Sequence, residues 1–314
     1  SLHGALPVSF HTHTSFSYGD GFGTVADHVR RVAGLGMTAV GVSEHGNLNS
    51  HAAFEKECLR NGLHFIPGIE AYFGPVGEKA TRRKTHLGIY AMNEVGYRNL
   101  NKIVTQSYID FYQWPTVSWE SLKENNEGLA ILSGCSDSFI SCRLLGGKFL
   151  GETRENFTDQ QYRDTCRAVE KFATVFENRY FLEVQRFPHL SRTCVLNQAF
   201  ARIGSEVGVP LFATADVHYP EKAHNKIQAA LHAARWASTA ADFVSGDSWE
   251  LHANLSYPES DAEILSDLMA TGLTEEQAWQ AIENTAGLAQ RCTAKLPKAE
   301  ALVYPQSKAD WEPW

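Results

Sequence analysis

"HTHTSFSYGD", residues 11–20, places two histidines two positions apart and an aspartate seven positions after the second. The segment follows a short apolar run, Leu6 to Phe10, that is typical of a buried β-strand. Because residues i and i+2 of a strand point to the same side, the imidazoles of His11 and His13 are expected to face one point. Such a pair can supply two ligands of a metal site. Because the pattern is short, two exposed or core histidines are the alternative explanation.

The composition indicates a globular protein with enough residues for one large domain or two small ones. The 314 residues are 43% hydrophobic and 20% charged, as in soluble domains. No apolar run approaches the roughly 18 residues that a membrane span needs, and no signal peptide opens the chain. The first residue is Ser1, which indicates a processed protein or a fragment. Six cysteines without C-x-x-C spacing favour reduced thiols in a cytoplasmic protein: Cys58, Cys135, Cys142, Cys166, Cys194 and Cys292.

The charge balance limits how this protein could bind a nucleic acid. The chain has 28 basic and 36 acidic residues, which gives a net charge of −8. Broad binding along a phosphate backbone requires a basic surface, so the charge argues against this mode. A nucleic-acid end that enters a metal-lined pocket remains compatible with the charge, because bound divalent ions would offset much of it.

Short apolar runs alternate with amphipathic, helix-like stretches along the chain. This alternation predicts βαβ units with parallel strand pairing. A closed or nearly closed βα barrel accounts for seven strands, and a doubly wound open sheet is the competing α/β architecture. The strands are expected near Val8–Phe10, Thr38–Ser43, Phe65–Ile69, Leu87–Ala91, Leu129–Ser133, Tyr180–Val184 and Leu211–Thr214.

Helix-capping residues support this division of the chain. Thr24 is a predicted N-cap for the helix that begins at Val25. The stretch "TEEQAWQAIENTAGLAQRC", residues 274–292, reads as a capped amphipathic helix. The following residues, 293–314, contain prolines and charges without a period. We therefore expect one domain over residues 1–292 and a linker or C-terminal tail over residues 293–314.

Metal-binding residue types follow five of the seven predicted strands. Because residues after the strands of a βα barrel converge on one rim, we expect these side chains to meet. Taken singly, each has another explanation, such as a histidine in a turn, a core cysteine or a helix N-cap. His86 begins a strand rather than following one, so the pattern alone does not include it. The residues after the strands are His11, His13, Asp20, His45, Glu70, Cys135, Asp216 and His218.

Imidazole, carboxylate and thiolate groups form a mixed ligand set that suits Zn²⁺, Mn²⁺ or Fe²⁺. Eight or nine ligands are too many for one tetrahedral ion, so two or three divalent ions with open positions are expected. Such ions clamp a phosphoryl group and activate water. Hydrolysis of a phosphate ester is the predicted chemistry. The other histidines are predicted to be surface or helix-face residues: His28, His51, His64, His189, His224, His232 and His252.

Several segments in this order resemble the PHP (polymerase and histidinol phosphatase) domain, in the form that opens the bacterial DNA polymerase III alpha subunit. The resemblance runs from about Val8 to Cys292 and includes nine motif positions. It implies a distorted seven-stranded βα (TIM-like) barrel, the PHP fold. The segments are "HTHTSFSYGDG", "SEHGNL", "PGIEAYF", "THLGIYAMNEVGYRNL", "GLAILSGC", "FLEVQRF", "VPLFATADVHY" and "WELHANLSYPES".

The resemblance also implies how the ligands are shared among up to three ions. One ion would take His11, His13, Glu70 and Asp216. A second would share Glu70 and add His86 and Cys135, so the resemblance restores His86. The third would take Asp20, His45 and His218. Arg186 in "VQRF" matches a family position near the site and is a candidate phosphate contact, with a surface salt bridge as the alternative. Arg82 and Arg83 are weaker candidates for the same role.

The resemblance leaves three functions to compare. The first is a 3′–5′ DNA exonuclease of the proofreading type, which hydrolyses terminal phosphodiesters with metal-activated water. The second is a phosphatase on a small phosphomonoester or pyrophosphate. The third is a metal-stabilised structural module of a DNA polymerase. The expected partners are a DNA 3′ end and polymerase or replisome subunits, with no membrane. The chain stops soon after the match, so we do not expect it to synthesise DNA alone.

Overall fold

A computed structural model of the chain describes residues 8–77, 84–147, 152–235 and 253–298. Within these ranges the strands are short, and most lie at the positions that the sequence pattern predicts. The strands are β1 (Val8–Ser9), β2 (Ala39–Gly41), β3 (His64–Ile66), β4 (Gly68–Phe73), β5 (Thr85–Ala91), β6 (Thr116–Val117), β7 (Leu129–Leu132), β8 (Gly146–Gly147), β9 (Glu152–Thr153), β10 (Tyr180–Gln185) and β11 (Leu211–Thr214).

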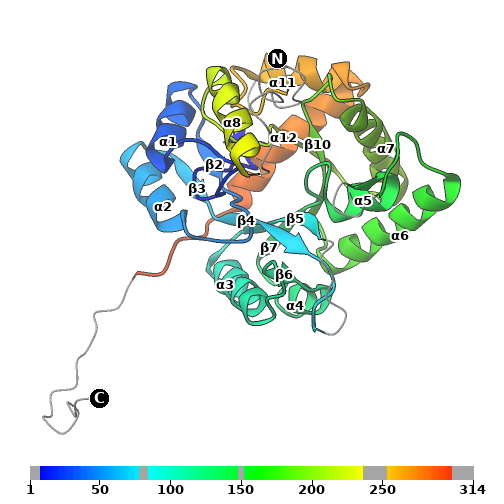
Figure 1. Cartoon of the computed structure of the whole chain (residues 1–314), viewed down its shortest axis with the longest axis horizontal. Helices are drawn as coiled ribbons and strands as arrows, with labels where there is room; N and C mark the ends of the chain where they lie inside the picture. The colour runs from blue at the N-terminus through cyan, green and yellow to red at the C-terminus, as the bar shows by residue number, and fades with distance from the viewer. Residues whose placement is uncertain (1–7, 78–83, 148–151, 236–252, 299–314) are drawn as a thin grey trace, which may run out of the picture.

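Helices separate most of these strands. Figure 1 shows α1 and α2 beside the β2 and β3 strands, with α5, α6 and α7 on the opposite side of the molecule. The helices are α1 (Val25–Gly34), α2 (His51–Arg60), α3 (Glu94–Ile109), α4 (Trp119–Glu124), α5 (Phe139–Leu145), α6 (Asp159–Val175), α7 (Ser191–Val207), the 3₁₀ helix η3 (Lys222–His224), α8 (Asn225–Arg235), α11 (Asp261–Ala270) and α12 (Glu275–Arg291).

Two sheets contain most of the strands. The larger sheet has the order β11-β10-β7-β5-β4-β6, and the smaller has the order β1-β2-β3. The pairs β1–β2, β2–β3, β10–β11, β7–β10 and β4–β6 are parallel, as predicted. The strands β8 and β9 form a separate antiparallel pair.

The prediction of parallel pairing is wrong for β5, which is antiparallel to both β4 and β7. Only residues 74–84 connect β4 to β5, and a parallel connection needs a crossover of a dozen or more residues, usually a helix. Because β5 runs in the opposite direction to β4 and β7, its N-terminal end lies at the edge where those two strands have their C-terminal ends. His86, near the start of β5, is thereby brought to that edge.

The segment predicted as one strand near Phe65–Ile69 is two strands, since β3 ends at Ile66 and β4 begins at Gly68. Pro67 separates them because it has no N–H group to continue a ladder. The β3 strand pairs with β2, whereas β4 pairs with β5 and β6. Glu70 consequently lies inside β4, and its predicted position just after a strand is wrong.

Two isolated parallel bridges join the sheets. Thr12 pairs with Val217, which connects the chain after β1 to the chain after β11, and His45 pairs with Glu70, which connects the chain after β2 to β4. The mixed α/β fold is thus confirmed. A single continuous barrel sheet is not, because in the described ranges all strands except the β8–β9 pair divide between two sheets joined through these bridges.

The predicted helix caps are confirmed. Thr24 accepts a hydrogen bond from the backbone N–H of Asp27 at the start of α1, and Thr274 does the same for Gln277 at the start of α12, each within a capping box. The α12 helix packs against β11 and β1. Capping therefore fixes where these helices begin, and apolar contact fixes where they lie.

The chain after α12 stays in contact with the domain over its first residues. Thr293 donates its backbone N–H to the carbonyl of Met92, and Leu296 donates its N–H to the Glu55 carboxylate. Residues 299–314, the rest of the predicted tail, lie outside the described residues. In the part of the chain that is described, no helix is long and apolar enough to cross a membrane.

Candidate metal centre

All nine predicted ligands lie at one edge of the strands. His11 and His13 follow β1, His45 follows β2, and Asp216 and His218 follow β11. The other members reach the same place from the loop before α1, from β4, from the start of β5 and from the segment after β7. These remaining residues are Asp20, Glu70, His86 and Cys135.

The first predicted group is in mutual contact. His11 Nε2 lies 3.3 Å from Glu70 Oε1 and 3.1 Å from Asp216 Oδ1. His13 Nε2 lies 3.6 Å from Glu70 Oε2 and 3.6 Å from Asp216 Oδ1. The two histidines therefore face one point, but the predicted strand alternation is not the reason, because β1 ends at Ser9 and His11 has a φ of 59°.

The second predicted group shares Glu70 with the first. His86 Nδ1 lies 3.3 Å from Glu70 Oε1 and 3.4 Å from Cys135 Sγ. His86 therefore contacts both Glu70 and Cys135, and its ligand atom also lies within 4.8 Å of those of His45 and Glu70. This juxtaposition depends on the antiparallel direction of β5.

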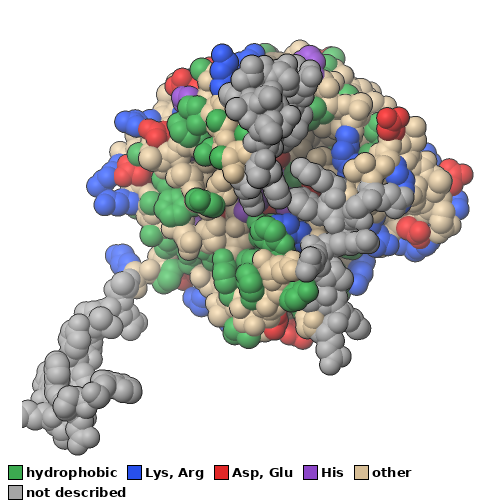
Figure 2. Space-filling model, in the orientation of Figure 1, with side chains coloured by type: hydrophobic (Ala, Val, Ile, Leu, Met, Phe, Trp, Pro, Cys, Tyr) green, Lys and Arg blue, Asp and Glu red, His purple; other side chains and the backbone are tan. Residues whose placement is uncertain are grey.

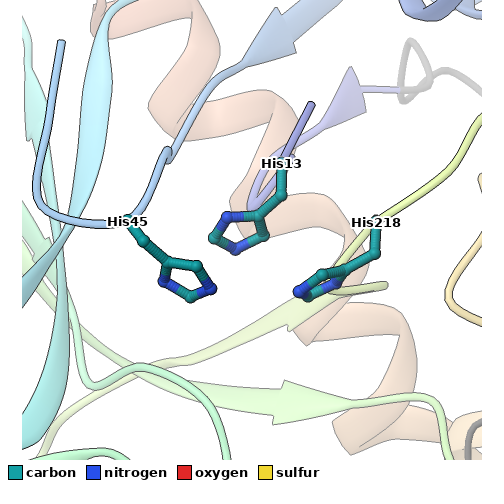
Figure 3. Close-up of side chains that lie close together, drawn as sticks. All are labelled: His13, His45 and His218. Carbon is teal, nitrogen blue, oxygen red and sulfur yellow. The ribbon is translucent and has the colours of Figure 1, made fainter. Parts of the chain in front are cut away.

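The third predicted group gathers around Asp20. His45 Nε2 lies 2.7 Å from Asp20 Oδ2, and His218 Nε2 lies 3.5 Å from the same oxygen. Ligand atoms of His13, His45 and His218 lie within 4.8 Å of one another, and Figure 3 shows their rings pointing into one space. His13 therefore stands between the first and third groups.

Hydrogen bonds outside the centre orient three of the imidazoles. His11 Nδ1 lies 2.6 Å from Glu183 Oε1, and His218 Nδ1 lies 2.8 Å from the carbonyl of Asp216. His13 Nδ1 lies 3.0 Å from the Ser17 hydroxyl oxygen. Each Nδ1 can therefore donate outward, which leaves the Nε2 lone pair directed at the centre, the usual arrangement for a metal-binding histidine.

The residues present fit divalent ions. A buried polar atom without a hydrogen bond costs about 1–3 kcal/mol, and ions between these side chains would satisfy such atoms. The donor set of imidazole, carboxylate and thiol suits Zn²⁺, Mn²⁺ or Fe²⁺. In the described part of the chain, the buried ligand atoms without a hydrogen-bond partner are His11 Nε2, His13 Nε2, His45 Nδ1, Glu70 Oε1 and Asp216 Oδ1.

Burial and charge shift the pKa values of these groups in opposite directions. Burial would lower the pKa of His45, but the Asp20 and Glu70 carboxylates raise it to about 10. Burial would raise the pKa of Glu70, but His86 and His11 hold it well below its ordinary value. The carboxylates therefore require compensating positive charge. Either protonated histidines or a divalent ion can supply it, so a bound ion would displace protons from the histidines.

His11 and Asp216 adopt backbone conformations that are uncommon for residues with a side chain. Their φ angles are 59° and 45°, in the left-handed region that disfavours residues other than glycine. They immediately precede Thr12 and Val217, which form the bridge between the two sheets. Strain of this kind persists where the surrounding structure imposes it, and it gathers at functional sites.

Sequence reasoning missed three residues that position the ligands. Glu183, in the middle of β10, holds His11, and His232 on α8 contacts the Asp20 carboxylate. Glu44, which is fully buried, accepts hydrogen bonds from the Thr14 backbone and the Ser17 hydroxyl. A carboxylate within the apolar strand "FLEV" was an available signal for Glu183. His232, on a helix face, gave none.

Arg186 does not take the predicted phosphate-contacting position. Its guanidinium is buried and pairs with Glu263 and Asp267 of α11, and it does not line the cavity at the centre. The salt-bridge alternative describes it better, although the site is buried rather than on the surface. Arg82 and Arg83 lie outside the described residues.

A cavity of about 520 Å³ opens beside the predicted ligands. Tyr72, Trp114 and Phe187 contribute aromatic side chains to its wall, and Lys84 and Arg192 contribute cations. A larger cavity of about 820 Å³ between β4, α4, α5 and α6 is lined by none of the nine predicted ligands. The smaller cavity is therefore the one that joins the metal-binding residues to a space for substrate.

An α/β fold with a cluster of buried histidines and carboxylates at one strand edge defines a candidate metal-dependent enzyme domain. The PHP domain model matches residues 9–187, and the chain belongs to this family. The resemblance seen in the motifs is confirmed.

Relatives of the chain include DNA polymerase III alpha subunits. The subunit of Helicobacter pylori is 26% identical over 290 residues, which cover 91% of this chain and 23% of the relative. That of Borreliella burgdorferi is 27% identical over 295 residues, with the same two coverages. The chain thus spans about a quarter of the length of these relatives.

Among solved structures, a two-domain protein from Bacteroides vulgatus, described as containing a predicted PHP-like metal-dependent phosphoesterase, has a TM-score of 0.42. It is 14% identical, and the match covers 68% of this chain and 52% of that one. This likeness is too distant to bear on the function.

Proposed function

We propose that this domain is a metal-dependent phosphoesterase that acts on DNA 3′ ends as a 3′–5′ exonuclease. The main observation in support of bound metal ions is the cluster of buried ligand atoms that have no hydrogen-bond partner among the described residues. Two or three divalent ions of Zn, Mn or Fe would be held by nine residues in a distorted, barrel-like ring of strands. The proposed ligands are His11, His13, Asp20, His45, Glu70, His86, Cys135, Asp216 and His218.

Ions bound here would supply Lewis acidity toward a phosphoryl oxygen and lower the pKa of water. The chain's own residues prepare that chemistry. Glu183 and Ser17 orient His11 and His13, as their Nδ1 contacts of 2.6 and 3.0 Å show. Glu70 contacts histidines from three separate segments, so its carboxylate joins the groups into one centre.

DNA is the proposed substrate because of the cavity wall and the relatives. Aromatic side chains stack on nucleobases without regard to sequence, and Trp114, Tyr72 and Phe187 line the cavity. The relatives named as DNA polymerase III alpha subunits support a substrate at a primer end, replisome subunits as partners and a cytoplasmic location.

A phosphatase acting on a small phosphomonoester or pyrophosphate is the second candidate. The net charge of −8 favours it, because a small substrate needs no basic path across the surface. Asp137 in the cavity wall adds to the negative charge that a DNA backbone would meet.

A time course on a 5′-labelled single strand and on a mismatched primer–template, with Mn²⁺ or Zn²⁺, tests the proposal. Shortening from the 3′ end that is lost in Asp216→Asn and in His11→Ala is the expected result. Asp164→Asn, at a half-buried position on α6 away from the predicted ligands, is the matched control and is expected to keep the activity.

Hydrolysis of p-nitrophenyl phosphate without any shortening of DNA would favour the phosphatase. Near-normal activity of Asp216→Asn after metal stripping and reloading would show that the ligand assignment is wrong. Circular dichroism of each variant confirms that the fold survives.

A further inference from the structure

Two segments with exposed aromatic side chains flank the metal cavity. One lies in the loop that ends at Asp20, and the other follows α3 and leads to the cavity wall. Figure 2 shows hydrophobic side chains gathered on this face over the region of β4, β6 and α3. We define the aromatic rim as Phe16 (41% exposed), Tyr18 (89%), Phe111 (54%), Tyr112 (47%) and the half-buried Trp114.

The loop after β2 connects the two segments of the aromatic rim. Asn47 Nδ2 donates a hydrogen bond of 3.2 Å to the carbonyl of Phe16. A Cβ on Gly46 would lie 2.9 Å from the Tyr72 ring and 3.1 Å from Pro115, the residue after Trp114. Both segments of the rim therefore lie against the loop that carries His45, and Trp114 extends the rim to the cavity wall.

A cation lies at the inner end of the rim. Lys84 Nζ lies 2.9 Å from the centroid of the Trp114 ring and 3.8 Å from that of Tyr72. Both contacts are cation–π interactions, and they hold Trp114 at the cavity wall. Asp110, beside Phe111, and Asp20 add negative charge near the rim. Stacking rather than phosphate pairing is thus the interaction that these residues favour.

Exposed apolar side chains that gather in one region mark an interaction site more often than scattered ones do. Of the large hydrophobic side chains exposed in the described ranges, six lie in residues 16–18 and 108–112. Planar aromatic groups beside a phosphoesterase cavity match the planar bases of a strand whose end is being cleaved. Stacking also tolerates the negative net charge, because it does not require a basic surface.

We infer that the aromatic rim is a stacking platform for the last unpaired bases of a DNA strand whose 3′ end enters the metal cavity. The inference rests on the proposed exonuclease function and adds a binding surface for the unpaired strand end. It assigns Tyr18 and Trp114 to substrate positioning.

Binding without catalysis tests the platform directly. The affinity for 5′-fluorescein-labelled dT12 is measured by fluorescence anisotropy in EDTA, for the wild type, Tyr18→Ala, Trp114→Ala and the control Leu59→Ala. Leu59 is 74% exposed on α2 and lies outside the rim. Loss of one stacked base weakens binding by at least about fivefold. We expect this loss in the two rim variants, and recovery in Tyr18→Phe and Trp114→Phe.

A second ligand separates bases from phosphates. A dT12 strand with abasic sites at its last three positions keeps the backbone charge but offers no bases to stack. The wild type is expected to bind it as weakly as Tyr18→Ala binds dT12, and Tyr18→Ala is expected to show no further loss with it.

Equal affinity of the wild type and both rim variants for dT12 would overturn the inference. The exposed aromatic side chains would then be assigned to binding a protein partner. The proposed function would still stand if the metal-loaded wild type shortened DNA from its 3′ end. Failure of the wild type to bind or shorten DNA, with a small phosphoester still hydrolysed, would overturn both.

Discussion

The Glu183 carboxylate lies 2.6 Å from Nδ1 of His11, on the side of the imidazole that faces away from the metal-binding cluster. Thr214 and Gln185 donate hydrogen bonds to the same Glu183 oxygen. The ring is thereby held with Nε2 toward Glu70 and Asp216. A carboxylate behind a histidine in this manner also raises its basicity as a ligand.

Replacing Glu183 with glutamine is expected to weaken metal binding about 10–100-fold, since outer partners of metal-binding histidines have effects of that size. Isothermal titration of the metal-free protein with Zn²⁺ or Mn²⁺ measures it. Glu206→Gln on the exposed surface of α7 is the control. An unchanged affinity in Glu183→Gln would remove the positioning role of Glu183.

Cys135 gives a spectroscopic test of the second ligand group. Burial raises the pKa of its thiol, and the Glu70 and Asp216 carboxylates raise it further. The thiol is therefore protonated until an ion displaces the proton. Loading with Co²⁺ is expected to produce a sulfur-to-metal charge-transfer band that Cys135→Ser lacks and that Cys142→Ser keeps. An identical band in all three proteins would exclude Cys135 as a ligand.

Arg186→Ala is expected to destabilise the domain rather than to weaken substrate binding. The guanidinium is buried between Glu263 and Asp267 of α11, and breaking such a pair costs about 3 kcal/mol. Urea unfolding measures the loss, with Arg30→Ala, an exposed i,i+3 pair on α1, as the control. A raised KM with unchanged unfolding free energy would instead restore the phosphate-contact role.

His51 makes the stability depend on pH. Burial lowers its pKa from 6.5 to about 4 in the folded protein, so the folded state binds fewer protons than the unfolded state between these values. Its contribution to stability is therefore complete above pH 6.5 and is lost as the pH falls toward 4. The shift corresponds to about 3 kcal/mol.

His51→Gln is the comparison, because its amide can still donate to the Gly68 carbonyl that His51 Nε2 contacts at 2.8 Å. Unfolding free energies of the two proteins are measured from pH 7.5 to pH 4. The wild type is expected to lose stability relative to the variant as the pH falls. Parallel curves would show that His51 is not buried as a neutral ring.

Most of the clustered residues could be predicted because strand ends are local patterns. His11 and His13 follow one apolar run, and Asp216 and His218 follow another. His86 could not be found in this way, since the direction of β5 depends on pairing with β4 and β7, which is a long-range property.

Two other differences have the same origin. The split at Pro67 was readable from the sequence, but which neighbours β3 and β4 would choose was not. Arg186 follows a strand just as a phosphate-binding residue would, yet its partners come from α11, some 77 to 81 positions later. Contacts at that separation leave no local pattern.

The bridges Thr12–Val217 and His45–Glu70 join the two sheets at the very residues that surround the proposed ions. An ion held by His11 and Asp216 would stabilise the first bridge, and an ion held by Glu70 and His45 would stabilise the second. Linkage is reciprocal. A change that raises the affinity for the ions would also stabilise the contact between the two sheets, and a change that separates the sheets would lower the affinity for the ions. An occupied centre would thus stabilise the junction of the two sheets as well as supply the proposed chemistry.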